Sequence, residues 1–339
     1  MLPKDRLSHL WKKGTDFLGA QHAILGGAMT WVSDRYLVSA LSNAGAFGVI
    51  ACGSMTPDLL RTEIQETFKL TTKPFGVNLI TMHPLINDLA QVCIDEKINH
   101  VFLAGGLPPA ITVKKLKDAG VKVICFAPAL ALALKFIRQG VDALVIEGME
   151  AGGHIGPVST SVLAQEILPH VKDIPVFVAG GIGRGESIVS YLEMGASGCQ
   201  MGTIFVCSHE AKVHPNFKKA FIHANARDAQ ASVQIDPRFP VIPVRAISNK
   251  ASEDFMNTQM SVIERFKREE LSQEEAQLEI EHYWAGALRR AAIDGDVDRG
   301  SLMAGQSVGM IKEVRPIQII IEELISQAVA QIELTQSSG

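Results

Sequence analysis

Two patterns of hydrophobic and polar residues alternate along the chain between residues 20 and 205. Short, almost continuously apolar runs indicate strands that are covered on both faces. Longer runs with apolar residues three or four positions apart indicate amphipathic helices between them. The pattern predicts eight strands: Ala23–Leu25, Phe47–Ile50, Phe75–Asn78, Val101–Leu103, Val121–Phe126, Ala143–Ile146, Val176–Ala179 and Gly198–Met201.

Glycine ends the predicted helix before four of these strands, at Gly45, Gly120, Gly140 and Gly195. Because glycine can adopt the left-handed conformation that stops a helix, each position marks a short connection from a helix to a strand. Eight repeats of strand and helix predict an α/β fold, a (β/α)8 TIM barrel, which needs about 250 residues. A doubly wound open sheet is the alternative for the same repeat.

The repeat stops after the eighth strand. Residues 206–285 carry scattered prolines and then a charged helical stretch over about 254–283. We predict a small helical insertion domain in this region, lying over the barrel mouth as a substrate lid. The barrel itself is predicted to comprise residues 1–205 and 286–339, with a last helix over Ile317–Ile332 packed on its outside.

Composition narrows the class of protein. The 339-residue chain is 47% hydrophobic and 20% charged, which excludes disordered and fibrous classes. Its formal charge of −4 gives no electrostatic support for binding nucleic acid or an anionic membrane. The five cysteines show neither a C-x-x-C pair nor zinc-ligand spacing, which predicts free thiols, a cytoplasmic protein and no metal site. The first residues lack the apolar core of a signal peptide.

The loop after the sixth predicted strand, residues 147–156, combines four glycines with one histidine, His154. Barrel enzymes carry their chemistry in the loops that follow the strands. Glycines let the backbone approach a ligand closely, and an imidazole beside that ligand can act as an acid or a base. We therefore predict that His154 is the catalytic residue. A flexible loop with a solvated histidine is the alternative.

The loops after the seventh and eighth predicted strands are also glycine-rich, with the sequences AGGIGRG (179–185) and QMGT (200–203). In many barrels these two loops bind phosphate through backbone N–H groups. We therefore predict a phosphate-bearing cofactor here, with the Thr203 hydroxyl as a further partner. The glycines do not form the G-x-G-x-x-G pattern of dinucleotide-binding sheets, since position 182 is isoleucine. Tight turns without a ligand are the alternative.

Two further segments belong to the same end of the predicted barrel. GGAMT (26–30) follows the first strand, and its small residues would let a flat ring lie against the backbone. Asn78 ends the third strand, in PFGVN (74–78). Its amide can both donate and accept hydrogen bonds, as the edge of a heteroaromatic ring requires.

These segments as a set resemble a known family. EGMEAGGHIG (147–156), AGGI, QMGT, PFGVN and the late segment GDVDRGSLMAGQSVGMI (295–311) resemble the FMN-dependent nitronate monooxygenase (2-nitropropane dioxygenase) superfamily. The likeness is closest to the type II flavin-containing trans-2-enoyl-ACP reductases. It covers nearly the whole chain, including PVRAI (243–247) in the predicted insertion.

The resemblance implies a set of FMN contacts and identifies His154 with the catalytic histidine of the family. The implied FMN contacts are Ala28, Met29, Asn78, Glu147, Gly152, Gly181, Gln200, Gly202 and Thr203. Ala28 stands where the family usually has glycine, which crowds the flavin slightly. Glu147 matches the reductases, whereas the similar nitronate monooxygenases carry glutamine, and this difference favours a reductase.

The resemblance also implies a reaction. FMN would take a hydride from NADH or NADPH and pass it to the β-carbon of an enoyl thioester, while His154, as an imidazolium, protonates the α-carbon. In the alternative reaction, His154 is a base on a nitroalkane or nitronate that is oxidised with oxygen. A flavin-binding protein without catalysis is a further alternative.

An acyl-thioester substrate makes an acyl carrier protein a candidate partner. An acidic carrier would need a basic rim, for which the predicted insertion offers Lys218, Lys219, Arg238 and Arg245. Ordinary surface charge is the alternative for these four residues. We expect neither nucleic acid nor a membrane as a partner, and a homodimer is left open.

Overall fold

Eight parallel strands form a barrel in the computed structural model, which describes residues 1–239, 243–283 and 286–337. The strand order is β1-β9-β8-β6-β5-β4-β3-β2. Each of the eight strands overlaps a predicted one. Their bounds are Ile24–Gly26 (β1), Val49–Ala51 (β2), Gly76–Ile80 (β3), His100–Ala104 (β4), Lys122–Phe126 (β5), Ala143–Glu147 (β6), Val176–Ala179 (β8) and Gly198–Met201 (β9).

The barrel closes between β1 and the segment that enters β2. Leu25 and Phe47 form a parallel bridge. In it, the Phe47 N–H donates to Ile24 O at 2.9 Å and the Gly26 N–H donates to Phe47 O at 2.8 Å. An open, doubly wound sheet would keep its two edge strands apart, so the barrel is confirmed over that alternative.

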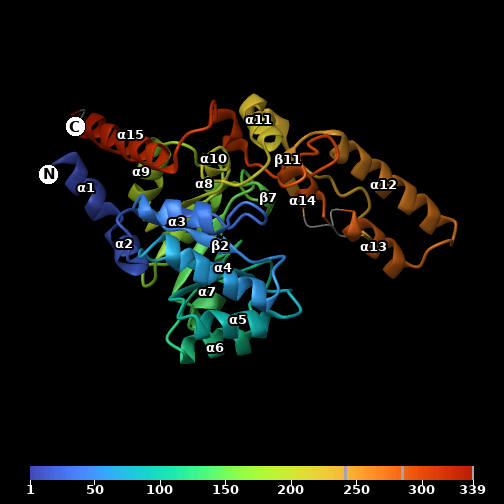
Figure 1. Ribbon diagram of the computed structural model, residues 1–339, viewed down its shortest axis with the longest axis horizontal. Helices are drawn as coiled ribbons and strands as arrows, with labels where there is room; N and C mark the ends of the chain where they lie inside the picture. Colours follow the sequence, from blue (N-terminus) through green and yellow to red (C-terminus); the bar gives the residue numbers. More distant parts are fainter. Residues whose placement is uncertain (240–242, 284–285, 338–339) are drawn as a thin grey trace.

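Helices surround the barrel (Figure 1). They are α3 (Arg35–Asn43), α4 (Pro57–Leu70), α5 (Ile86–Asp95), α6 (Ala110–Asp118), α7 (Leu130–Arg138), α8 (Thr160–Ile167), α9 (Gly185–Glu193) and α15 (Ile317–Ser337). The predicted last helix is confirmed as α15, which packs against α9 and against α1 (Pro3–Leu10), so the two ends of the chain lie side by side. The four predicted helix-stop glycines have φ values between +79° and +104°.

Helix α2 (Lys12–Leu18) covers the amino end of the strands through Phe17. The carbonyl oxygen of Phe17 accepts from His100 Nε2 at 2.9 Å and from Lys122 Nζ at 2.5 Å. The Phe17 ring meets the His100 ring edge-on, with centroids 5.3 Å apart. Because the imidazole is buried, its pKa falls to about 4, and His100 stays neutral at physiological pH.

The region after β9 contains the predicted helices and, in addition, two short strands. Strands β10 (Ala229–Ala231) and β11 (Val244–Ile247) join β7 (Gly153–His154) in a three-stranded antiparallel sheet. These strands are too short to show a pattern in the sequence, and they form because the loop after β6 supplies their third partner. The helices here are α10 (Thr203–Val206), α11 (Pro215–His223), α12 (Lys250–Lys267), α13 (Gln273–His282) and α14 (Ala287–Ala292).

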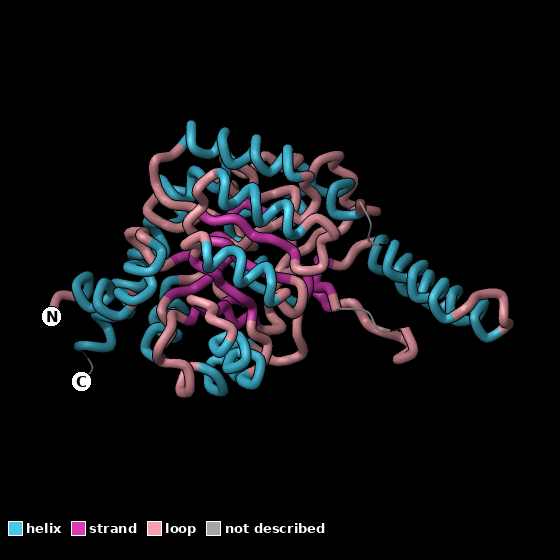
Figure 2. Tube along the Cα trace, turned by 90° about the horizontal axis from the view of Figure 1, so that it is seen from below, coloured by secondary structure: helices cyan, strands magenta, loops and turns pink. Residues whose placement is uncertain are grey.

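Helices α12 and α13 pack together as a hairpin that extends away from the barrel (Figures 1 and 2). The hairpin has a small apolar cluster of its own, made of Phe239, Phe255, Val262, Ile263, Ala276 and Ile280. Phe217 and Phe221 of α11, by contrast, pack in the main core of the barrel. The domain boundary at residue 206 stays a prediction, although the packing ties the first part of the segment to the barrel. Residues 240–242 and 284–285 of the predicted insertion lie outside the described residues.

No described helix combines the length and apolar character needed to cross a membrane.

We expect the stability of the fold to depend on pH through His100. An unfolded histidine takes up a proton below about 6.5, whereas the folded protein resists protonation until about pH 4. Neutral His100 therefore makes its full contribution to the free energy of unfolding above pH 6.5. As the pH falls from 6.5 toward 4, the free energy of unfolding decreases by about 3 kcal/mol in total. Urea unfolding of the wild type and of His100→Gln across this range measures it, because the variant should have the shallower pH dependence.

The exposed His9 provides the control for this measurement. His9→Gln should follow the wild-type pH dependence, because the substitution changes an exposed side chain and leaves His100 in place. If the free energy of unfolding depends on pH equally in His100→Gln and in the wild type, His100 is not the source of the pH dependence.

Candidate functional site

Three polar side chains lie at or near the carboxyl ends of strands around the barrel mouth. Asn78 lies in β3, Glu147 ends β6 and Gln200 lies in β9. The strand register pairs Glu147 with Ala179, and Ala179 with Gln200, so these positions lie at one level of the barrel. Asn78 and Gln200 are only 5% and 7% exposed. Within the described residues none of the three side chains makes a hydrogen bond, which leaves their polar atoms for a ligand.

Glu147 carries an unusual carboxyl group. Desolvation by the surrounding barrel raises its pKa to about 7, because burial disfavours the charged form. A carboxyl with this pKa is about half protonated at neutral pH. Glu147 can therefore donate a hydrogen bond as well as accept one, which an ordinary glutamate at this pH cannot do.

The loop after β1 lies against the loop after β9. The Gly27 N–H donates to Met201 O at 2.8 Å, and a Cβ on Gly202 would lie 3.3 Å from Met29 Sδ. Ser33 holds this loop in shape, because its Oγ accepts from Met29 N and donates to Gly27 O, both at 3.0 Å. Met29 therefore lies beside Gly202, and Ala28 lies in the same loop. The positioning role of Ser33 could not be recognised before the loop geometry was known.

Gly181 and the loop after β6 come together through Glu150. A Cβ on Gly181 would lie 3.0 Å from Glu150 Cβ, and Gly181 has a φ of +71°. The Glu150 carboxylate accepts from the Thr160 N–H at 2.9 Å and from the Thr160 hydroxyl at 2.8 Å, at the start of α8. Glu150 therefore anchors the loop that leads to His154, a role that the motif alone did not show.

The late glycine-rich segment is part of the site. Thr203 Oγ1 accepts from the Gly305 N–H at 2.9 Å, which leaves the hydroxyl proton of Thr203 free to be donated to a ligand. A Cβ on Gly152 would lie 2.5 Å from the backbone of Ala304 and Gly305. The Gln306 N–H donates to Glu150 O at 2.9 Å. Segment 304–306 therefore fastens two of the predicted cofactor loops together, although none of its residues was assigned from the sequence.

His154 lies on β7, where it pairs with Val244 of β11. Its side chain is exposed, yet the surrounding protein desolvates the ring enough to lower its pKa below the usual 6.5. The neutral imidazole is therefore the main form at neutral pH. The imidazolium that the sequence prediction used is the minor form, but its lower pKa makes it a stronger acid.

Arg245 holds the strand that carries His154, and it lies 4% exposed in the interior. Its Nε donates to Met149 O at 2.9 Å and its Nη1 donates to Ala229 O at 2.5 Å, while its backbone pairs with Gly153. Burial lowers the pKa of the guanidinium, and the charge of Glu150 opposes that shift. Arg245 therefore cannot serve in a basic rim, since its donors are used inside the protein.

Two of the other rim candidates are also engaged. Lys218 Nζ donates to Ser208 O at 2.5 Å, and Arg238 forms an ion pair with Asp236 at 2.6 Å. Lys219 is exposed. The acyl carrier protein stays a prediction, and the described positions give the basic rim less support than the sequence suggested.

The arrangement fits the FMN that the resemblance implies. Asn78, Glu147 and Gln200 offer unused donors and acceptors for the edge of a polar ring, while the half-buried Met29 offers an apolar side chain. Gly181, Gly202 and Thr203 would hold the phosphate, because glycines leave backbone N–H groups accessible. No group of three or more His, Cys, Asp or Glu side chains in the described ranges is placed to hold a metal ion.

A family model and a solved structure each match most of this chain. The family model described as nitronate monooxygenase matches residues 12–100 and 89–327. The solved structure of FabK from Thermotoga maritima is 37% identical, with a TM-score of 0.86, and the match covers 96% of this chain and 98% of that one.

Curated relatives carry two kinds of name. A protein from Rhodococcus jostii named (3aS,4S,5R,7aS)-5-hydroxy-7a-methyl-1-oxo-octahydro-1H-indene-4-carboxyl-CoA dehydrogenase is 29% identical over 340 residues, covering 94% of this chain and 96% of its own length. A probable nitronate monooxygenase from Bacillus subtilis is 28% identical over 333 residues, covering 86% and 90%.

We expect Gly152→Ala to separate the two cofactor loops. The new Cβ would lie 2.5 Å from the backbone of Ala304 and Gly305, so segment 304–306 must move, at a cost of about 1–3 kcal/mol. The purified variant should be less stable in urea and should carry less flavin, measured as the ratio of flavin to protein absorbance.

Gly156→Ala is the matched control, because a Cβ at Gly156, in the same loop, meets no atom within 4 Å. It should retain wild-type stability and flavin content. A Gly152→Ala protein with full flavin content would show that the late segment does not support the cofactor site.

Proposed function

Because the chain belongs to the nitronate monooxygenase family of flavin-dependent oxidoreductases, we propose that it is an FMN-dependent reductase of trans-2-enoyl thioesters that uses NADH or NADPH. The observation that carries the proposal is Glu147, a carboxyl with a raised pKa at the end of β6. The resemblance implies a glutamate at this position in the reductases. The likeness to FabK, a type II enoyl-ACP reductase, supports it. The substrate would be an acyl thioester, presented on an acyl carrier protein in fatty-acid synthesis.

The reaction adds one hydride and one proton across a carbon–carbon double bond. FMN supplies the hydride chemistry when it is bound, and NAD(P)H is the source of the hydride. The chain supplies the proton and the geometry. His154 delivers the proton to the α-carbon from the exposed position on β7, and solvent reprotonates the ring. The raised pKa of Glu147 lets the carboxyl donate a hydrogen bond at the mouth without adding a full negative charge.

Nitronate oxidation is the second candidate. The observation that favours it is the lowered pKa of His154, since a neutral imidazole can remove a proton from the α-carbon of a nitroalkane. This reaction consumes oxygen and needs no NAD(P)H. The two candidates therefore use the same histidine in opposite protonation states.

Anaerobic mixing of the flavin-loaded protein with NADH and with NADPH tests the proposed function. We expect one of them to bleach the flavin absorbance and crotonyl thioester to restore it without oxygen. If neither nucleotide bleaches the flavin and oxygen is consumed with a nitronate, nitronate oxidation replaces the proposal.

The pH dependence of turnover tests the role of His154. As a proton donor, His154 must be protonated, so the rate should fall as the pH rises through its lowered pKa, below 6.5. As a base it would give the opposite slope. His154→Ala should retain flavin and lose turnover by about 10²- to 10⁴-fold.

The exposed His170 provides a control, and His170→Ala should turn over at the wild-type rate. Unchanged turnover in His154→Ala would remove His154 from the mechanism.

A further inference from the structure

Trp31 occupies a strained position at the barrel mouth. It directly follows the segment GGAMT, in which Met29 lies against Gly202, and it has a φ of +66°. Bulky residues rarely adopt this left-handed conformation, and when they do, the strain is often linked to function. The indole is 39% exposed, although tryptophan would gain stability from burial. The backbone therefore holds a large flat ring at the surface, next to the proposed cofactor loops.

A cation from another element lies over this ring. Arg289 of α14 places its guanidinium carbon 5.8 Å from the centre of the Trp31 ring. Only one terminal nitrogen of this guanidinium, Nη1, contacts Asp294, at 2.9 and 3.1 Å. Among the described residues, Nε and Nη2 of Arg289 have no hydrogen-bond partner. Asp294 thus fixes the orientation of the guanidinium and leaves two of its nitrogens available for an anion.

A second cation, Lys212, lies over the ring of Tyr36, five residues after Trp31. Lys212 Nζ lies 5.4 Å from the centre of the Tyr36 ring, and within the described ranges it forms no ion pair. The segment that carries Lys212 is joined to α14 by the hydrogen bond from His214 N to Ala292 O, at 2.7 Å. Helix α14 therefore contacts both the loop after β1, through Arg289 and Trp31, and the segment after α10, which in turn contacts Tyr36 at the start of α3.

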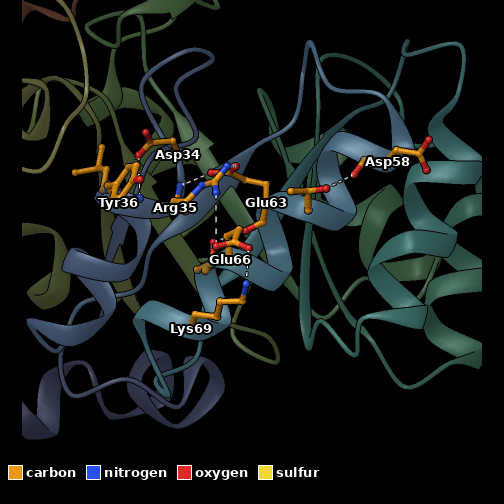
Figure 3. Close-up of polar contacts among 10 residues, drawn as sticks. Asp34, Arg35, Tyr36, Asp58, Glu63, Glu66 and Lys69 are labelled. Carbon is orange, nitrogen blue, oxygen red and sulfur yellow. Dashed lines mark hydrogen bonds and ion pairs between the residues drawn. The ribbon is translucent and has the colours of Figure 1, made fainter.

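Neighbouring charged side chains already form ion pairs or hydrogen bonds within the protein. Arg35 is paired with Glu63 at 2.6 Å and lies 3.9 Å from Glu66 (Figure 3). Asp34 uses its carboxylate to accept from the backbone at the start of α3. Arg289 keeps two nitrogens without a hydrogen-bond partner and Lys212 forms no ion pair among the described residues, so both can contact an anion.

We propose that Trp31, Arg289 and Lys212 bind the adenosine diphosphate unit of a nucleotide that reaches the barrel mouth. A purine ring would stack on the indole, and the phosphates would contact the two cations. Both NAD(P)H and coenzyme A thioesters contain this unit, so the shared chemistry is a purine ring joined to phosphates. The inference rests on the proposed function in one respect: the hydride donor or the acyl substrate of the reductase must carry such a nucleotide.

Calorimetric titration of the flavin-loaded protein with ADP tests the site without turnover. We expect ADP to bind, and Trp31→Asn to weaken its binding about tenfold, because a stacked base is lost. Asparagine tolerates positive φ, so the backbone can keep its conformation. Trp31→Phe should recover part of the affinity. Arg289→Gln should weaken ADP binding by a similar factor, and it provides a second variant if Trp31→Asn does not fold.

Arg238→Gln is the matched control. Arg238 is likewise an exposed arginine that pairs with an aspartate and lies over aromatic rings, but it belongs to the segment that packs on the α12–α13 hairpin. The control should bind ADP like the wild type. Absence of ADP binding in the wild type, or equal ADP affinity in the wild type, Trp31→Asn and Arg289→Gln, would overturn the proposal.

Steady-state kinetics then identify the source of the nucleotide. If Trp31→Asn raises the KM for NADH or NADPH, the site serves the hydride donor. If it raises the KM for crotonyl-CoA and leaves that for crotonyl N-acetylcysteamine, which lacks the nucleotide, the site serves the acyl substrate. Either result supports the site. The two proposals fail separately. If NAD(P)H does not bleach the flavin, the proposed reductase function is wrong, whereas the nucleotide site is tested by the ADP titration alone.

Discussion

The parallel bridge between Leu25 and Phe47 is the contact on which the rest of the site depends. It closes the ring of strands, and because the barrel is closed, the carboxyl ends of all eight strands surround one opening. With β1 fixed between Phe47 and β9, the loop after β1 lies on the loop after β9, joined by the bond from Gly27 N to Met201 O. An open sheet would place these two loops at different distances from the remaining polar strand ends.

Segments from outside the repeat complete the mouth. The late segment contacts both Thr203 and the loop after β6, and β11 supplies the strand against which His154 is held. Arg245 strengthens this second connection from the interior by binding carbonyl oxygens of two other segments. The barrel therefore determines where each loop lies. The late segment and β11 determine the conformation that the loops adopt.

Desolvation acts on the two titratable groups of the mouth in opposite senses. It raises the pKa of the Glu147 carboxyl to about 7 and lowers the pKa of the His154 imidazole. Both shifts favour the neutral form, because a low-dielectric environment penalises charge of either sign. Near neutral pH the Glu147 carboxyl is about half protonated and the His154 imidazole is mainly neutral, so both groups can exchange a proton with a ligand or with water.

Hydrophobic periodicity and the helix-stop glycines predicted all eight barrel strands and the C-terminal helix, because these signals depend on residues close together in the chain. The motif loops likewise pointed to Asn78, Glu147, His154 and Gln200. Other features depend on distant segments. Thr203 meets Gly305 across about a hundred residues, and Arg245 is buried only because two other segments pack around its strand. The amino-acid sequence by itself determined the repeat and the chemistry placed at its strand ends. The tertiary structure decided which atoms stay free for a ligand and which way each pKa shifts, since burial and hydrogen bonding exist only when remote parts of the chain meet.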